Sequence, residues 1–106
     1  MPASNLMTYW LTPAAQYDLE DIWLYTAQQW SIEQADRYTD ILEDTFDRLL
    51  FMPEMARERP EFDPPVRIHP SAEHLIIYHI ESDHLVIMRV LGASQDWPII
   101  LRAVDQ

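Results

Sequence analysis

Between residues 11 and 51 the apolar and small residues recur with the period of a helix. In the first half of this segment they follow one another at steps of four, three and four, and the second half carries a similar stripe. The positions are Ala15, Leu19, Ile22 and Thr26 in the first half, and Ala35, Tyr38, Leu42, Thr45 and Leu49 in the second. Residues three and four apart share one face of a helix, so the pattern predicts two amphipathic helices.

Capping residues set the limits of the two predicted helices. Thr12 supplies a hydroxyl cap, and Pro13 follows at a position where a missing N–H has no cost. Ser31, with a glutamine three residues later, has the spacing of a capping box. We therefore expect helices at 13–30 and 31–51, joined so closely that they form a hairpin.

Four shorter segments are rich in β-branched and aromatic residues and predict strands. They lie at residues 7–11, 66–69, 74–81 and 84–91. A tight turn at Ser82-Asp83 joins the last two, and the proline-rich stretch 53–65 is expected to be an irregular connector. The order β-α-α-β-β-β predicts an α+β fold, with the N-terminal strand and the helical hairpin packed on one face of an antiparallel sheet. Residues 1–106 are expected to form a single domain, with an apolar tail from about residue 93.

The last two predicted strands are apolar on both faces. Across their hairpin Ile77 is expected to face Met88, and side chains alternate along each strand. One face then carries Leu75, Ile77, Val86, Met88 and Val90, and the other carries Ile76, Tyr78, Ile80, Leu85, Ile87, Arg89 and Leu91. Two helices can cover only one of these faces. The second cover is either the chain's own tail, through Trp97 or residues 99–101, or a segment of a partner protein.

The chain is strongly acidic, with 18 Asp and Glu residues against seven arginines, no lysine and a net charge of −11. Unspecific nucleic-acid binding depends on neutralising phosphates, so the composition argues against it. Acidic residues on the helices form either a solvated face or a docking surface for a basic partner. The lack of cysteine excludes disulfides and thiolate metal sites. No apolar run approaches the roughly 20 residues of a membrane span, so we expect a soluble cytoplasmic protein without membrane contact.

Residues that could bind a metal or carry catalysis are poorly placed. The four histidines lie five positions apart, at His69, His74, His79 and His84. An odd spacing sends neighbours on a strand to opposite faces, so they cannot converge on a zinc ion. The single glycine rules out a glycine-rich phosphate loop, and the serines lack a glycine elbow. The sequence predicts no metal, no cofactor and no catalytic residue.

Several segments, taken in order, carry a resemblance to a known family. They are residues 11–26 and 30–35, Val66-Arg-Ile-His-Pro70, His74-Leu-Ile-Ile-Tyr78 and Arg89-Val-Leu91. Over about residues 7–90 this order resembles the ParE/RelE toxins of bacterial type II toxin–antitoxin systems, most closely the ParE branch.

The resemblance implies a toxin that is neutralised by a cognate antitoxin in a hetero-oligomer. The antitoxin would have a ParD-like ribbon-helix-helix fold, and operator DNA would be bound only through it. DNA gyrase, through its A subunit, would be the target. Because toxins of the ParE branch act by binding, the resemblance also implies that the protein is not an enzyme. Two alternatives stay open: ribosome-dependent mRNA cleavage through Arg67 and Arg89, as in the RelE branch, and a decayed module that binds the antitoxin without being toxic.

Antitoxin contacts are expected in two places. Tyr17 and Leu24 lie off the core stripe of the first helix, beside acidic residues that suit a partner with apolar and basic side chains. The open face of the sheet would supply Ile76, Tyr78, Ile87 and Arg89.

Target contacts are expected near the end of the chain and on the sheet. The candidates are Arg67, Arg89, Gln95, Asp96 and Trp97. In this region the sequence departs from the family. Ser94 and Gln95 stand where two basic residues are usual, and Ala72-Glu73 stands where a glycine and a basic residue are usual.

Overall fold

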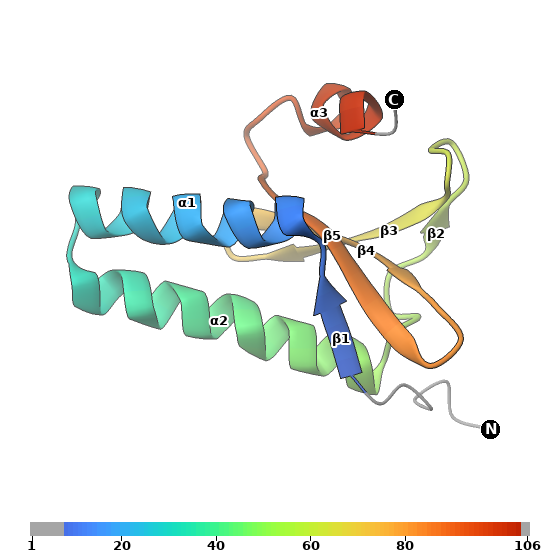
Figure 1. Cartoon of the computed structure of the whole chain (residues 1–106), viewed down its shortest axis with the longest axis horizontal. Coiled ribbons are helices and arrows are strands. Elements are labelled where there is room, and N and C mark those ends of the chain that lie inside the picture. Colours follow the sequence, from blue (N-terminus) through green and yellow to red (C-terminus); the bar gives the residue numbers. More distant parts are fainter. Residues whose placement is uncertain (1–7, 105–106) are drawn as a thin grey trace.

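The computed structural model describes residues 8–104, and its helices and strands follow the predicted order (Figure 1). They are β1 (Thr8–Leu11), α1 (Pro13–Gln29), α2 (Ile32–Phe51), β2 (Glu58–Arg59), β3 (Val66–Ser71), β4 (His74–Ile80), β5 (His84–Gly92) and α3 (Trp97–Val104). The predicted α+β fold is confirmed. The short strand β2 within the proline-rich connector and the helix α3 in the apolar tail were not predicted as regular elements.

The helices α1 and α2 lie side by side as an antiparallel hairpin (Figure 1). Both predicted caps are present: Thr12 Oγ1 accepts from the Ala15 amide at 3.1 Å, and Ser31 Oγ accepts from the Gln34 amide at 3.0 Å. Thr12 Oγ1 also donates to the Met88 carbonyl oxygen at 2.7 Å. The start of α1 is therefore fixed to β5, which sets the hairpin at a defined place on the sheet.

The five strands form one sheet in the order β1-β5-β4-β3-β2. Neighbouring strands are antiparallel except at one edge, where β1 runs parallel to β5. The sheet is therefore mixed. Parallel neighbours require a long crossover, and here the chain from α1 to β4 forms it.

A β-bulge interrupts the pairing of β4 with β5. Near the turn the strands keep the expected register, but beyond the bulge Ile77 faces Arg89 instead of Met88. The predicted pair of Ile77 with Met88 is therefore wrong by one residue. An extra residue on one strand reverses the alternation beyond it. As a result Val90 joins the cluster under the helical hairpin, and Leu91 joins the cluster on the other side.

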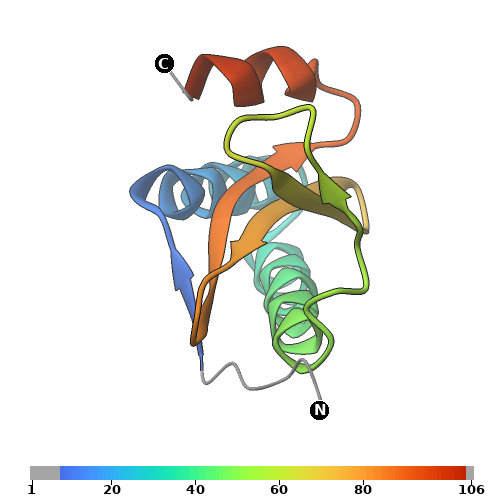
Figure 2. The same ribbon diagram turned by 90° about the vertical axis from the view of Figure 1, so that its right-hand side faces the viewer.

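Two clusters of buried side chains lie on opposite faces of the sheet. Under the hairpin, the cluster includes Leu42, Phe46, Leu49, Ile76, Tyr78, Leu85, Ile87 and Val90. Under α3, the cluster includes Phe62, Val66, Ile77, Leu91 and Leu101. Figures 1 and 2 show α3 apart from the hairpin, against the sheet. Of the two covers that the sequence left open, the chain's own tail covers the second face.

The face that the sequence analysis left open is the face that the hairpin covers. Ile76, Tyr78 and Ile87 are fully buried there, and a partner cannot reach them while α1 and α2 stay in place. The sequence could not choose between the faces, because both are apolar enough to bind the helices. The hydrogen bond from Thr12 to Met88 holds the start of α1 on β5, and the hairpin packs on the face that carries Ile76, Tyr78 and Ile87.

Candidate functional site

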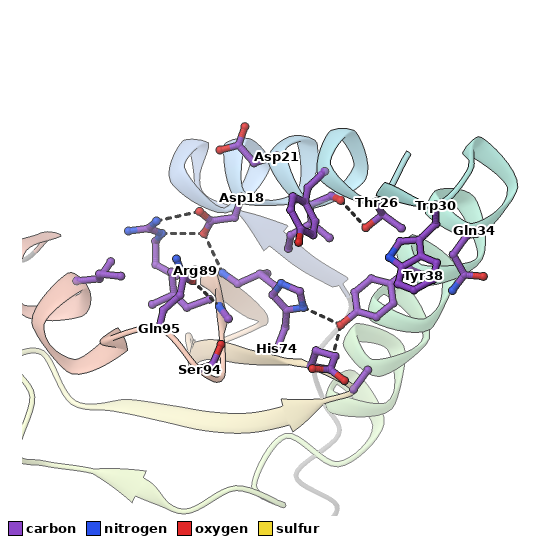
Figure 3. A pocket seen from close by; sticks show the side chains of 18 residues that line it. Asp18, Asp21, Thr26, Trp30, Gln34, Tyr38, His74, Arg89, Ser94 and Gln95 are labelled. Carbon is purple, nitrogen blue, oxygen red and sulfur yellow. Dashed lines mark hydrogen bonds and ion pairs between the residues drawn. The ribbon is translucent and has the colours of Figure 1, made fainter. Parts of the chain in front are cut away.

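A pocket of about 1010 Å³ opens beside the helical hairpin, and we call it the hairpin pocket (Figure 3). Its walls come from α1, α2, the turn between β3 and β4, the end of β5 and the loop that leads to α3. The lining residues are Asp18, Asp21, Ile22, Tyr25, Thr26, Trp30, Gln34, Tyr38, Ala72, Glu73, His74, Arg89, Val90, Leu91, Gly92, Ser94, Gln95 and Ile100. The pocket therefore brings together segments that are far apart in the sequence.

An ion pair between Asp18 and Arg89 forms one wall of the pocket. Arg89 Nε and Nη2 donate to the two carboxylate oxygens of Asp18 at 2.7 and 2.8 Å, and the amide of Val90 donates to the same carboxylate at 2.9 Å. The hydrogen bonds to Asp18 raise the pKa of Arg89 further above its ordinary value. Both side chains are largely buried. The charge of Arg89 is thus neutralised within the protein, and the pair ties α1 to β5 just beyond the bulge.

Tyr38 of α2 joins the pocket floor to the turn between β3 and β4. The amide of Glu73 donates to Tyr38 Oη at 3.0 Å, and this oxygen lies 2.7 Å from His74 Nδ1. Burial lowers the pKa of His74 below its ordinary value, so the neutral ring is favoured. The Tyr38 hydroxyl and His74 Nδ1 therefore share a hydrogen bond between two uncharged groups. Burial also raises the pKa of Tyr38, which keeps this hydroxyl protonated.

The turn itself has a residue in an unusual conformation. Ala72 has a φ of 54°, in the left-handed region that favours glycine. Ala72 is one of the positions where the resemblance led us to expect a glycine. The amide of the neighbouring Glu73 donates to Tyr38 Oη, and the Glu73 carbonyl oxygen accepts from the Ala93 amide at 3.0 Å. These two hydrogen bonds hold the turn in place.

The loop between β5 and α3 is closed by Gln95. Its Oε1 accepts from the Gly92 amide at 2.7 Å, and a Cβ at position 92 would lie 3.0 Å from the same oxygen. Ser94 and Asp96 are exposed on this loop, while Trp97 is half-buried with its ring centroid 6.1 Å from that of Phe62. Among the predicted target contacts, Gln95 and Trp97 thus also have structural roles.

The predicted antitoxin contacts are divided by the structure. Tyr17 and Leu24 on α1 are exposed by 67% and 52%, in agreement with their place off the core stripe. Arg89 lines the hairpin pocket, but the other predicted contacts on the sheet, Ile76, Tyr78 and Ile87, are buried in the core. Tyr78, for example, donates its hydroxyl proton to the Pro53 carbonyl at 2.7 Å.

Arg67 lies away from Arg89. Its Nη1 donates to the Ala56 carbonyl at 2.6 Å, and it lines a separate, smaller pocket with Glu54 and Glu58. The two arginines therefore do not converge on a common point, as a phosphate-binding pair would have to.

Several residues of the pocket were not singled out for function in the sequence. Asp18 lies three positions after the core residue Ala15, and a carboxylate on the core side of a helix indicates a buried partner. Tyr38 was assigned to the core stripe, and His74 was considered only as a metal ligand. Within residues 8–104 no group of three or more His, Cys, Asp or Glu side chains could hold a metal ion. No helix in the described part of the chain is long and apolar enough to cross a membrane.

Fold and site define a small α+β domain with a pocket beside its helical hairpin, and comparisons with known proteins identify the family. The family described as "ParE toxin of type II toxin-antitoxin system, parDE" matches residues 9–97. Toxin ParE1 of Mycobacterium tuberculosis is 33% identical over 89 residues, which cover 83% of this chain and 91% of the relative. Toxin ParE1 of Caulobacter vibrioides is 32% identical over 88 residues, with the same coverage of both chains.

The fold is similar to that of a solved structure. A chain titled "Chromosomal ParDE TA system from P. aeruginosa" aligns with a TM-score of 0.72 and 16% identity, over 85% of this chain and 98% of that one. The chain described here therefore belongs to the ParE toxin family of type II toxin–antitoxin systems. The resemblance identified from the sequence is confirmed, including its assignment to the ParE branch.

Proposed function

We propose that this ParE-family toxin is neutralised by a cognate antitoxin and that it acts by binding DNA gyrase, without catalysing a reaction. The antitoxin is expected to be a ribbon-helix-helix protein that carries the complex to operator DNA, and the toxin is expected to work in the cytoplasm. Antitoxin pairing is supported by the family and by the two-component name of the structural relative. The gyrase target rests on membership of the ParE branch.

The observation that carries antitoxin binding is the exposed face of α1. Tyr17 and Leu24, two turns apart, are exposed, and the acidic Glu20 and Asp21 lie between them. Exposed apolar side chains bordered by charges are typical of protein–protein interfaces. An antitoxin helix with apolar and basic side chains would complement this face.

The contacts that Arg67 and Arg89 make within the protein support action by binding rather than by RNA cleavage. RNA cleavage needs cations free to stabilise charge on a phosphate. Arg89 is paired with Asp18, and Arg67 donates to a backbone carbonyl in a different part of the surface. Neither arrangement favours the ribonuclease alternative.

The test of the target is to induce this chain alone in a bacterium and to follow growth, chromosome integrity and message length. Arrest with double-strand breaks is the expected result. Arrest with intact DNA and shortened messages would contradict gyrase binding and favour ribonuclease action. No arrest from a folded, expressed protein would contradict toxicity in that host and favour a non-toxic antitoxin-binding module.

The test of the antitoxin face is co-expression with the product of the neighbouring gene. This product should rescue growth of cells that carry the wild-type toxin. The double variant Tyr17→Ala/Leu24→Ala should still arrest growth but be rescued poorly, because the partner's contact area is lost. The variant Ile41→Ala removes a similarly exposed apolar side chain from α2 and should be rescued normally. Equal rescue of all three proteins would exclude the α1 face as the antitoxin site.

A further inference from the structure

The hairpin pocket has more negative than positive charge, although Arg89 lies in its wall. Asp18, Asp21 and Glu73 contribute three carboxylates, against the one guanidinium of Arg89. Arg89 and Asp18 neutralise each other, and the ion pairs found among residues 8–104 include neither Asp21 nor Glu73. Both of these carboxylates are exposed at the edge of the pocket. The pocket therefore favours a cation and disfavours a phosphate.

Exposed aromatic rings lie at the end of the pocket nearest the connection between α1 and α2. Tyr25 is exposed by 63% and Trp30 by 75%, and both line the pocket. Figure 3 shows Trp30 beside Gln34 and Tyr38, on the side of the pocket away from Arg89. The aliphatic stem of an arginine or lysine packs on such rings, and its charged end is attracted to the ring faces.

We propose that the hairpin pocket binds a basic side chain, arginine above all, from the segment of the antitoxin that crosses α1. This inference rests on the proposed antitoxin binding and names the chemistry of the anchor that secures it. The stem of the side chain packs against the exposed rings of Tyr25 and Trp30, and its guanidinium group is attracted by the negative charge of Asp21 and Glu73 at the pocket edge. Arginine suits the site better than lysine, because its planar group stacks on aromatic rings and is more weakly hydrated.

Other occupants fit the pocket less well. A second copy of this chain carries the same net charge of −11 and is repelled. A nucleic acid meets the same repulsion at the pocket edge. A basic segment is also continuous with the proposed interface, since Leu24 on the outer face of α1 is followed directly by Tyr25 in the pocket wall. One segment can therefore contact the α1 face and place a side chain in the pocket.

The first test compares antitoxin affinity for two charge-matched double variants. Asp21→Asn/Glu73→Gln removes both pocket carboxylates, whereas Asp40→Asn/Asp44→Asn removes two exposed carboxylates of α2 that do not line the pocket. With the purified antitoxin from the neighbouring gene as the probe, we expect the dissociation constant of the pocket variant to rise roughly tenfold, and that of the control to change about twofold or less. Equal changes in both variants would indicate general charge attraction and overturn the proposal, as would no change in either.

The second test identifies the anchor on the partner. Each arginine and lysine in the toxin-binding segment of the antitoxin is replaced in turn by glutamine, and affinity is measured for wild-type toxin and for Asp21→Asn/Glu73→Gln. The anchor is the residue whose replacement weakens binding to the wild type but has little further effect on the variant. If every basic residue has additive effects with the toxin variant, no anchor enters the pocket and the proposal is wrong.

The aromatic part of the site is tested at Trp30. Because Trp30 is largely exposed, Trp30→Ala is expected to leave the fold intact and to weaken antitoxin binding, and Trp30→Phe is expected to restore most of the affinity. Wild-type affinity for Trp30→Ala would contradict the packing of the anchor on this ring. If the antitoxin fails to bind even the wild-type toxin, the proposed antitoxin function itself fails. Binding that persists unchanged in all pocket variants refutes the pocket anchor alone.

Discussion

At the scale of single residues, the structure is held together by a few polar contacts between distant elements. Asp18 joins α1 to β5 through Arg89, and Tyr38 joins α2 to the turn before β4 through His74. Each contact is inside the hairpin pocket or at its wall. The residues that shape the binding surface therefore also stabilise the fold, and substitutions there must be tested for both effects.

Replacing Arg89 with methionine is expected to destabilise the protein by about 2 to 3 kcal/mol, because it leaves the largely buried Asp18 carboxylate without its charged partner. Urea denaturation would measure the change. Arg37→Met is the matched control, since Arg37 is exposed and contacts Gln34 on the same helix, and it should cost about 0.5 kcal/mol or less. Similar losses in both variants would show that the pair with Asp18 is not a specific source of stability.

Stability is expected to fall as the pH drops below the ordinary histidine pKa of about 6.5. Burial holds the pKa of His74 below this value in the folded protein, although Glu73 and Asp18 oppose the shift. The unfolded chain therefore binds more protons in this range, and lower pH favours unfolding. The urea midpoint of His74→Gln should fall less between about pH 7.5 and about pH 5.5 than that of the wild type. His69 is present in both proteins, so it does not account for a difference; parallel pH profiles would contradict the prediction.

At the scale of elements, α3 has the role that the sequence analysis left undecided. It covers the apolar face of the sheet opposite the helical hairpin, and its Leu101 side chain is buried there, with 1% exposed. Two arginines add to this packing: Arg102 lies 4.9 Å from the centroid of the Phe62 ring and Arg59 lies 6.0 Å from it. The tail is therefore part of the folded domain.

Leu101→Ala is expected to destabilise the protein by about 2 to 4 kcal/mol, because it leaves a cavity between α3 and the sheet. Ile99 in the same helix is 63% exposed, so Ile99→Ala should cost less than about 0.5 kcal/mol. Thermal and urea unfolding of the two variants would separate them. Equal stability would mean that α3 contributes little to the second cluster.

At the scale of the whole molecule, the net charge of −11 is the dominant electrostatic property. The acidic residues on α1 and α2 repel one another within the folded protein. Salt should screen this repulsion more than it weakens the few ion pairs. The same excess of charge favours a basic partner over a second copy or a nucleic acid.

The urea midpoint of the isolated toxin is therefore expected to rise when NaCl is increased from about 0.05 to about 0.5 M. In Asp40→Asn/Asp44→Asn, which has two charges fewer, the rise should be smaller. A midpoint that falls with salt would show that ion pairs such as that of Arg89 outweigh the general repulsion.

The sequence by itself determined the family and most of the elements, namely α1, α2 and the strands β1, β3, β4 and β5, but not β2 or α3. Helical periodicity, the caps at Thr12 and Ser31, and the apolar strands depend on neighbours close in the chain, so they could be predicted locally. The exposure of Tyr17 and Leu24 followed from the same periodicity.

Only the tertiary structure decided which face of the sheet each helix covers and where the pocket lies. A single extra residue in β5, at Met88, exchanged the predicted faces of Val90 and Leu91, and no local pattern marks that bulge. The partner of Asp18 is 71 positions away at Arg89, and that of Tyr38 is 36 positions away at His74. Such pairs form because the folded sheet brings distant segments within hydrogen-bonding range. A hydrogen bond acts only over a few ångströms, so which residues it joins depends on how the whole chain folds. For that reason the sequence could not show these pairs.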